Sequence, residues 1–159
     1  MDVFGIIILA TEKWKKDKIL NHGASVLAEL LDNDNDGCAD DPNALHYLTS
    51  PSTDLEALGK LQVVVFSNFE EKFTKATKAA LAKKNWVKVK TVTPFDVFTK
   101  CAGLKISDGC WDATIEEMCH FIHKNGHGVA YPKIFSSSSD TKSQLTNAMD
   151  VARYVWHNR

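Results

Sequence analysis

The sequence predicts an α+β fold, or a three-layer α/β arrangement, in which amphipathic helices pack on a small mixed sheet. Short apolar segments alternate with stretches of helical periodicity, which is typical of a β-α-β order. The chain has 159 residues, of which 44% are hydrophobic and 25% are charged. This is the composition of an ordinary globular protein. We therefore expect a single domain over residues 1–159, with a sheet of about three or more strands.

Three segments are expected to form the strands. Phe4 to Ala10 and Leu61 to Ser67 are short, apolar and rich in β-branched side chains, as buried strands are. Trp86 to Val92 alternates apolar and polar residues, which is typical of a strand with one face in solvent.

Helical spacing separates and follows these strands. Before the second strand, one apolar stripe recurs at helical spacing and predicts a helix of about four turns. Its members are Ile19, Leu20, Gly23, Val26, Leu27, Leu30 and Leu31. The segment "PNALHYL" predicts a short helix, and the lysine-rich segment after Ser67 predicts an amphipathic helix with a solvated lysine face.

Two more helices are expected in the C-terminal third. A compact helix should run from about Ile115 to Lys124 and end at Asn125-Gly126 in a left-handed cap. The stretch Thr141 to Gln144 fits a capping box for a last helix. The apolar face of that last helix comprises Leu145, Ala148, Met149, Ala152 and Val155.

Charge and hydropathy exclude two classes of partner. The 19 basic and 20 acidic residues give a net charge of −1, so the chain lacks the broad positive surface of a nucleic-acid binder. The apolar run Phe4 to Ala10 is too short to span a bilayer, and we expect a soluble protein with no membrane partner. A cytosolic protein and a mature secreted domain both fit, and we favour the extracellular location.

The four cysteines have no CxxC spacing, which argues against a zinc ribbon. Both a pair of disulfides and a set of reduced, partly buried thiols fit the even count, because the sequence does not encode the redox compartment. Cys101 and Cys110 would close a short loop if they were paired.

The segment "LDNDNDGCADDP" places five aspartates within ten residues, at positions 32, 34, 36, 40 and 41. Alternate side chains of a D-x-D-x-D-G segment turn toward one centre, and the glycine permits a sharp bend. Calcium takes six to eight oxygen ligands in a loose shell. The alternative is an acidic surface loop, since Asp, Asn and Gly all favour turns.

This segment resembles the calcium loop of EF-hands and related DxDxDG modules. The resemblance implies a Ca²⁺ ion bound by the side chains of Asp32, Asp34 and Asp36 and by the backbone carbonyl of Cys38, with Asp40 or Asp41 completing the shell. The chain departs from the EF-hand pattern at the twelfth position, which holds Asn43 instead of glutamate. Pro42 disfavours helical geometry at Asp41, so we do not expect a regular EF-hand exit helix from this point.

A second polar cluster lies in the segment Cys110 to Pro132. Glu116, His120 and His123 are spaced i, i+4 and i+7, so a helix would carry them on one face. The run Glu116 to His120 resembles the active helix of zincin peptidases with the first histidine replaced by glutamate. By that resemblance Glu116, His120 and His123 would bind zinc, with His127 and His22 as other candidate ligands, and Glu117 would be the general base.

The start of this helix also fits a purely structural role. Thr114 to Glu117 also fits a capping box, with Thr114 as the N-cap, and then Glu117 would only hold the end of the helix. A Cys–His nucleophile pair, such as Cys119 with His123, has no local sequence feature in its favour.

Three functions follow from these patterns. The leading hypothesis is a calcium-binding protein whose ion fixes the turn after the first long helix, with the His/Glu helix as a second functional surface. One alternative is a small zinc-dependent metallopeptidase-like hydrolase. The other is an extracellular interaction or matrix module stabilised by calcium. Whether the protein is an enzyme stays open.

Overall fold

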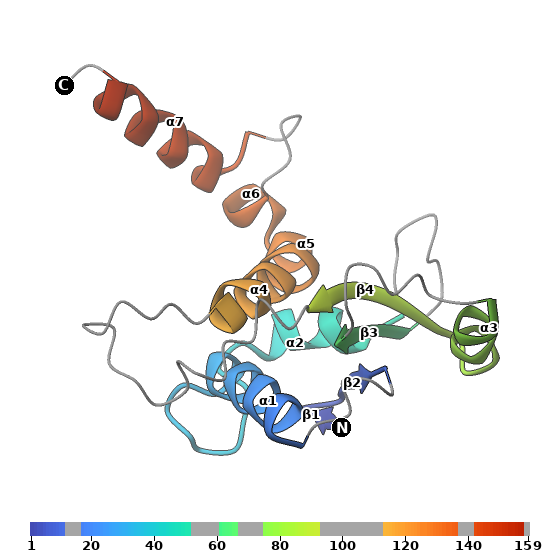
Figure 1. Cartoon of the computed structure of the whole chain (residues 1–159). Helices are drawn as coiled ribbons and strands as arrows, with labels where there is room; N and C mark the ends of the chain where they lie inside the picture. The colour runs from blue at the N-terminus through green and yellow to red at the C-terminus, as the bar shows by residue number, and fades with distance from the viewer. Residues whose placement is uncertain (12–16, 52–60, 67–74, 93–112, 137–141, 158–159) are drawn as a thin grey trace.

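The computed structural model describes residues 1–11, 17–51, 61–66, 75–92, 113–136 and 142–157 (Figure 1). Helices and strands occur together in these ranges, and helical residues outnumber those in strands. The predicted mixture of helix and strand in one chain is therefore confirmed. The single domain over residues 1–159 stays a prediction.

Strands β1 (Asp2–Val3), β2 (Ile6–Ala10), β3 (Leu61–Phe66) and β4 (Trp86–Val92) form a sheet in that order. β1 and β2 are antiparallel, whereas β2, β3 and β4 run parallel. Parallel neighbours need a long connection, and helices α1 and α2 lie between β2 and β3 in the chain (Figure 1). The register shifts in β3 at Val63/Val64.

The first predicted strand is wrong at its start, because the chain reverses there. Phe4 and Gly5 form the two-residue turn between β1 and β2, with φ values of 52° and 85°. Positive φ at both central residues is what a type I′ hairpin turn requires. The Asp2 Oδ1 atom accepts the Gly5 N–H at 2.8 Å, and the Phe4 side chain packs against the core.

A core forms where three helices meet the sheet. Helices α1 (Asp17–Leu31), α2 (Pro42–Thr49) and α4 (Ala113–Ile122) each contribute to it. Its largest fully buried apolar side chains are Ile6, Ile8, Leu27, Leu48, Val64, Met118 and Phe121. The predicted stripe of α1 is buried at Gly23, Val26, Leu27 and Leu31, half-buried at Leu20 and Leu30, and outside the described side chains at Ile19.

Helix α3 (Lys75–Lys83) follows β3, and its described lysines are exposed. The C-terminal elements are the π-helical turn η3 (His123–His127), α5 (Gly128–Ala130), α6 (Pro132–Phe135) and α7 (Gln144–His157). Helix α7 extends away from the sheet (Figure 1).

The predicted left-handed cap at Asn125-Gly126 is wrong. Helix α4 passes directly into η3 and α5, and among the described glycines only Gly5 and Gly37 have positive φ. A Cβ atom on Gly126 would lie 3.2 Å from the Leu48 side chain and 3.3 Å from the Ala44 carbonyl oxygen. The close approach of α2, and not a turn, therefore favours glycine at this position.

The last helix is capped two residues later than the sequence indicates. Ser143, which is fully buried, precedes α7, and its hydroxyl accepts the Thr146 N–H at 3.1 Å. The Thr146 hydroxyl accepts the Ser143 N–H at 2.9 Å. This reciprocal pair satisfies two backbone donors, and Thr141 lies outside the described residues.

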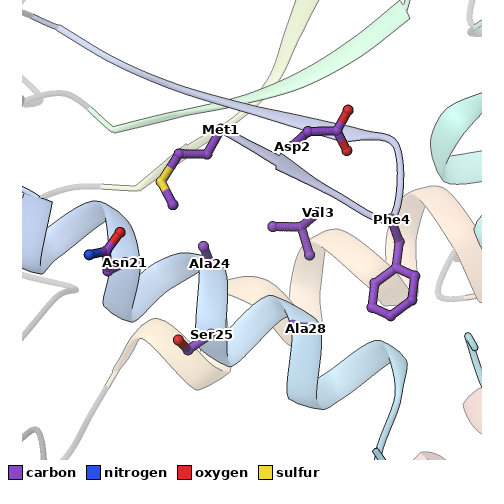
Figure 2. Close-up of a pocket in the computed structure, with 8 residues that line it drawn as sticks. All are labelled: Met1, Asp2, Val3, Phe4, Asn21, Ala24, Ser25 and Ala28. Atoms are coloured by element: carbon purple, nitrogen blue, oxygen red, sulfur yellow. The ribbon is translucent and has the colours of Figure 1, made fainter. Parts of the chain in front are cut away.

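A hollow of about 430 Å³ separates the β1–β2 hairpin from α1. Val3 and Phe4 point toward it, Asn21 and Ser25 line it from the helix, and the Asp2 carboxylate points away (Figure 2). Its lining is mainly apolar and holds no group of converging titratable side chains, so it offers little for chemistry.

Candidate metal site

The aspartate loop joins the end of α1 to the start of α2. The Asp32 N–H donates to the Ala28 carbonyl oxygen at 2.9 Å, which continues the last turn of α1. The Asp40 N–H donates to the Leu31 carbonyl oxygen at 2.8 Å. The two ends of the loop are therefore tied by backbone hydrogen bonds, and the loop has a helix on each side.

Asp32 is the anchor of the loop. Its side chain is buried, with the residue 7% exposed. Its Oδ1 atom accepts the Asp36 N–H at 3.1 Å and its Oδ2 atom accepts the Gly37 N–H at 3.0 Å. Each carboxylate oxygen has a second lone pair, so these bonds orient Asp32 and still leave it able to bind a cation.

Asp34 and Asp40 complete a group of three carboxylates. Ligand oxygens of Asp32, Asp34 and Asp40 all lie within 4.8 Å of one another. The Asp34 Oδ1 atom accepts the Asp36 N–H at 3.3 Å, and the Asp40 Oδ2 atom accepts the Asn33 N–H at 3.0 Å. These three carboxylates could hold a metal ion, and an all-oxygen donor set suits hard cations such as Ca²⁺, Mg²⁺ or Mn²⁺.

Asp36 was expected in the same shell, but the described group of three carboxylates does not include it. The Asp36 Oδ1 atom instead accepts the Cys38 N–H at 2.7 Å, which forms a local turn. Gly37 has a φ of 87°, and a Cβ atom there would meet nothing within 4 Å. Gly37 is therefore needed for its backbone conformation and not for space.

Asp41 is not a member of this group of three, and it caps α2. Its Oδ1 atom accepts the N–H groups of Asn43 at 3.1 Å and Ala44 at 2.9 Å. The short helix predicted over "PNALHYL" does follow the loop as α2, because Pro42 occupies the first helical turn while Asp41 keeps the non-helical φ of −123° that a following proline favours. Proline is well tolerated at that position, and the restriction it imposes on Asp41 is compatible with an N-cap.

Two more partners of Asp41 come from the other end of the chain. The Tyr131 hydroxyl donates to the Asp41 Oδ1 atom at 3.0 Å, and the His127 Nε2 atom lies 3.6 Å from the Asp41 Oδ2 atom. Nothing in the local sequence indicates these contacts, since Tyr131 is 90 residues away. A tertiary contact of this kind has no short-range spacing to reveal it.

The second predicted cluster is less closely assembled. The Glu116 Oε1 and His120 Nε2 atoms lie 3.6 Å apart, but both side chains are more than half exposed. The His123 ring instead packs edge-on against Phe135, at a centroid distance of 6.2 Å. No group of three metal-ligating side chains that includes Glu116, His120 or His123 occurs in the described residues.

The capping interpretation of this helix also needs correction. Helix α4 begins at Ala113, so Thr114 lies inside its first turn and is fully buried instead of forming the N-cap. Glu117 is half-buried and has an interaction partner. Its role as general base stays a prediction.

Cys119 does not resemble an activated nucleophile. Cys38 and Cys119 are unpaired thiols, whereas Cys101 and Cys110 lie outside the described residues. Partial burial raises the pKa of the Cys119 thiol. A raised pKa keeps the sulfur protonated at neutral pH, which is the opposite of what nucleophilic catalysis needs.

Comparisons with known proteins leave this site to be judged on its own geometry. No protein-family model, no curated protein and no solved structure matches the chain. Among the described helices, none combines the length and the apolar character that crossing a bilayer demands.

Proposed function

We propose that the protein binds a divalent cation, and specifically Ca²⁺, in the loop between α1 and α2. The proposal depends on one observation: oxygens of Asp32, Asp34 and Asp40 lie within 4.8 Å of one another. At that separation two carboxylates in water repel by roughly 1 kcal/mol. A bound cation would turn this repulsion into attraction and would fix the junction of the two helices.

Calcium is favoured over zinc by the chemistry of the donors. Zinc sites in proteins are built mainly from cysteine and histidine, whereas Ca²⁺ takes only oxygen ligands. Three carboxylates do not fill a calcium shell by themselves. The Cys38 carbonyl, the second carboxylate oxygens and water are the remaining ligands that we propose.

Titration calorimetry with Ca²⁺ and Mg²⁺ tests this proposal directly. We expect Ca²⁺ to bind at a ratio of one ion per chain and Mg²⁺ to bind more weakly, because Mg²⁺ demands a tighter octahedral shell. With Ca²⁺ at 100 times its Kd, the melting temperature should exceed that in EGTA by roughly 5 to 10 °C. Absence of both the binding heat and the shift would contradict the proposal.

The Kd for Ca²⁺ obtained from this titration would also distinguish two cellular roles. A Kd of about 10⁻⁴ to 10⁻³ M is typical of extracellular modules in which calcium only rigidifies the fold, whereas intracellular sensors bind at about 10⁻⁷ to 10⁻⁵ M. We infer the first role, because no second group of this kind accompanies the loop within the described residues. We do not propose the metallopeptidase alternative, because no third metal ligand joins Glu116 and His120 among the described residues.

A further inference from the structure

The carboxylate of Asp41 joins three separate elements of the molecule. It caps α2 through the N–H groups of Asn43 and Ala44. It accepts the hydroxyl of Tyr131, the residue between α5 and α6, and it faces His127 of η3. These contacts place one charged group at the boundary between the exit helix of the loop and the C-terminal helices.

The boundary around Asp41 is closely packed. Gly126 approaches Leu48 and the Ala44 carbonyl so closely that a methyl group would not fit without a shift. The Phe135 ring contacts both His127 and Tyr131, at centroid distances of 5.4 and 6.3 Å. Closely packed interfaces resist gradual deformation, so a displacement of Asp41 would be transmitted to η3.

Asp41 directly follows Asp40, a member of the proposed cation site. A single planar peptide unit connects the two residues, so a change in the position of Asp40 constrains Asp41. We propose that Asp41 couples cation binding in the loop to the docking of α2 on η3, so that the C-terminal helices respond to occupancy of the loop. This inference rests on the proposed function.

Thermodynamic linkage makes the coupling measurable from either side. If the ion strengthens the contact between Asp41 and Tyr131, then that contact must strengthen ion binding by the same factor. Tyr131→Phe removes only the hydroxyl that donates to Asp41, and it changes no charge. We expect it to weaken Ca²⁺ binding, measured by calorimetry, by roughly fivefold, the lower end of typical couplings.

Thr49→Val is the matched control. The Thr49 hydroxyl donates within α2 to the Leu45 carbonyl oxygen at 2.9 Å, at the opposite end of the helix from Asp41. The same hydroxyl also reaches the His46 carbonyl oxygen at 3.4 Å. Its loss removes these side-chain hydrogen bonds from the same helix and leaves Asp41 capped. The Kd of this variant for Ca²⁺ should stay within a factor of two of the wild-type value.

Hydrogen exchange of the Ala44 amide, which Asp41 accepts, provides a second readout in the wild-type protein itself. Saturating Ca²⁺ should slow this exchange, and slow it less in Tyr131→Phe. If the wild-type protein binds Ca²⁺ but Tyr131→Phe binds it equally well, or if the Ala44 exchange is unchanged by Ca²⁺, the coupling is wrong and the cation site stands. If the wild-type protein does not bind Ca²⁺, the proposed function fails and the coupling fails with it.

Discussion

The aspartate loop and the His/Glu face of α4 are two regions that sequence spacing marks as candidate metal sites, and they differ in how their side chains are arranged. In the loop, backbone N–H groups orient the carboxylates of Asp32, Asp34 and Asp40 into one group. On α4, Glu116 and His120 are close but exposed, and no third ligand joins them among the described residues. The backbone N–H groups of a local turn can orient its own carboxylates, whereas a metal site on one face of a helix needs a further ligand from another part of the chain.

The largest effect is expected from Asp32→Ala, which tests the metal site of the aspartate loop. It removes a proposed ligand and two acceptors of backbone N–H groups. Calcium binding should fall below detection by calorimetry, and the free energy of unfolding without calcium should drop by about 1 to 3 kcal/mol. Retention of normal Ca²⁺ affinity would show that the three carboxylates are not the site.

Gly126→Ala tests the packing role that we assign to the π-helical turn η3, which directly follows α4. The added methyl group would meet Leu48 and the Ala44 carbonyl, and overpacking of this kind costs about 1 to 3 kcal/mol. Urea denaturation should therefore show a lower midpoint. An unchanged urea midpoint would mean that α2 shifts to accommodate the methyl group, and the packing role that we assign to η3 would be wrong.

A smaller effect separates the ligand set expected from the sequence from the one that the structure assembles. Asp36→Asn and Asp34→Asn remove the same charge from the same loop. The Asp36 carboxylate accepts the Cys38 N–H and lies outside the group of three. Asp36→Asn should therefore weaken Ca²⁺ binding less than Asp34→Asn does. The expected difference in binding free energy is about 1 kcal/mol, the interaction energy of two unit charges about 4 Å apart in water. Equal losses of Ca²⁺ affinity in the two variants, measured by calorimetry, would mean that Asp36 binds the ion as Asp34 does, which is what the DxDxDG pattern predicts.

The smallest effect is expected from Glu116→Gln and from His120→Ala. An exposed i,i+4 pair contributes about 0.3 to 0.5 kcal/mol at most, so the melting temperature should change by little more than 1 °C. Zinc content, measured by elemental analysis of the purified protein, should be negligible in wild type and variants alike. Stoichiometric zinc that disappears in both variants would reverse our view of α4.

Short-range patterns predicted much of this molecule. The stripe of α1, the segments of β3 and β4, and the turn at Gly37 all depend on residues within a few positions of one another. Two features escaped because they depend on distant contacts. Gly126 resembles a helix cap in the sequence, but its conspicuous contact in the structure is the close approach of α2. The contacts of Asp41 with Tyr131 and His127 have no signal in the local sequence. Phe4 was missed for a local reason, because its apolar side chain resembles the strand residues that follow it although it lies in the hairpin turn.

The backbone bond that closes the aspartate loop has a consequence for the thermodynamics of the ion. Because the Asp40 N–H already reaches the Leu31 carbonyl, much of the conformational entropy of the segment is lost when the chain folds. An arriving ion then has little of the loop itself left to order, and within the loop the main change is the release of water from the ion and the carboxylates. Association should therefore be entropically driven and fast, as in other preorganised receptors.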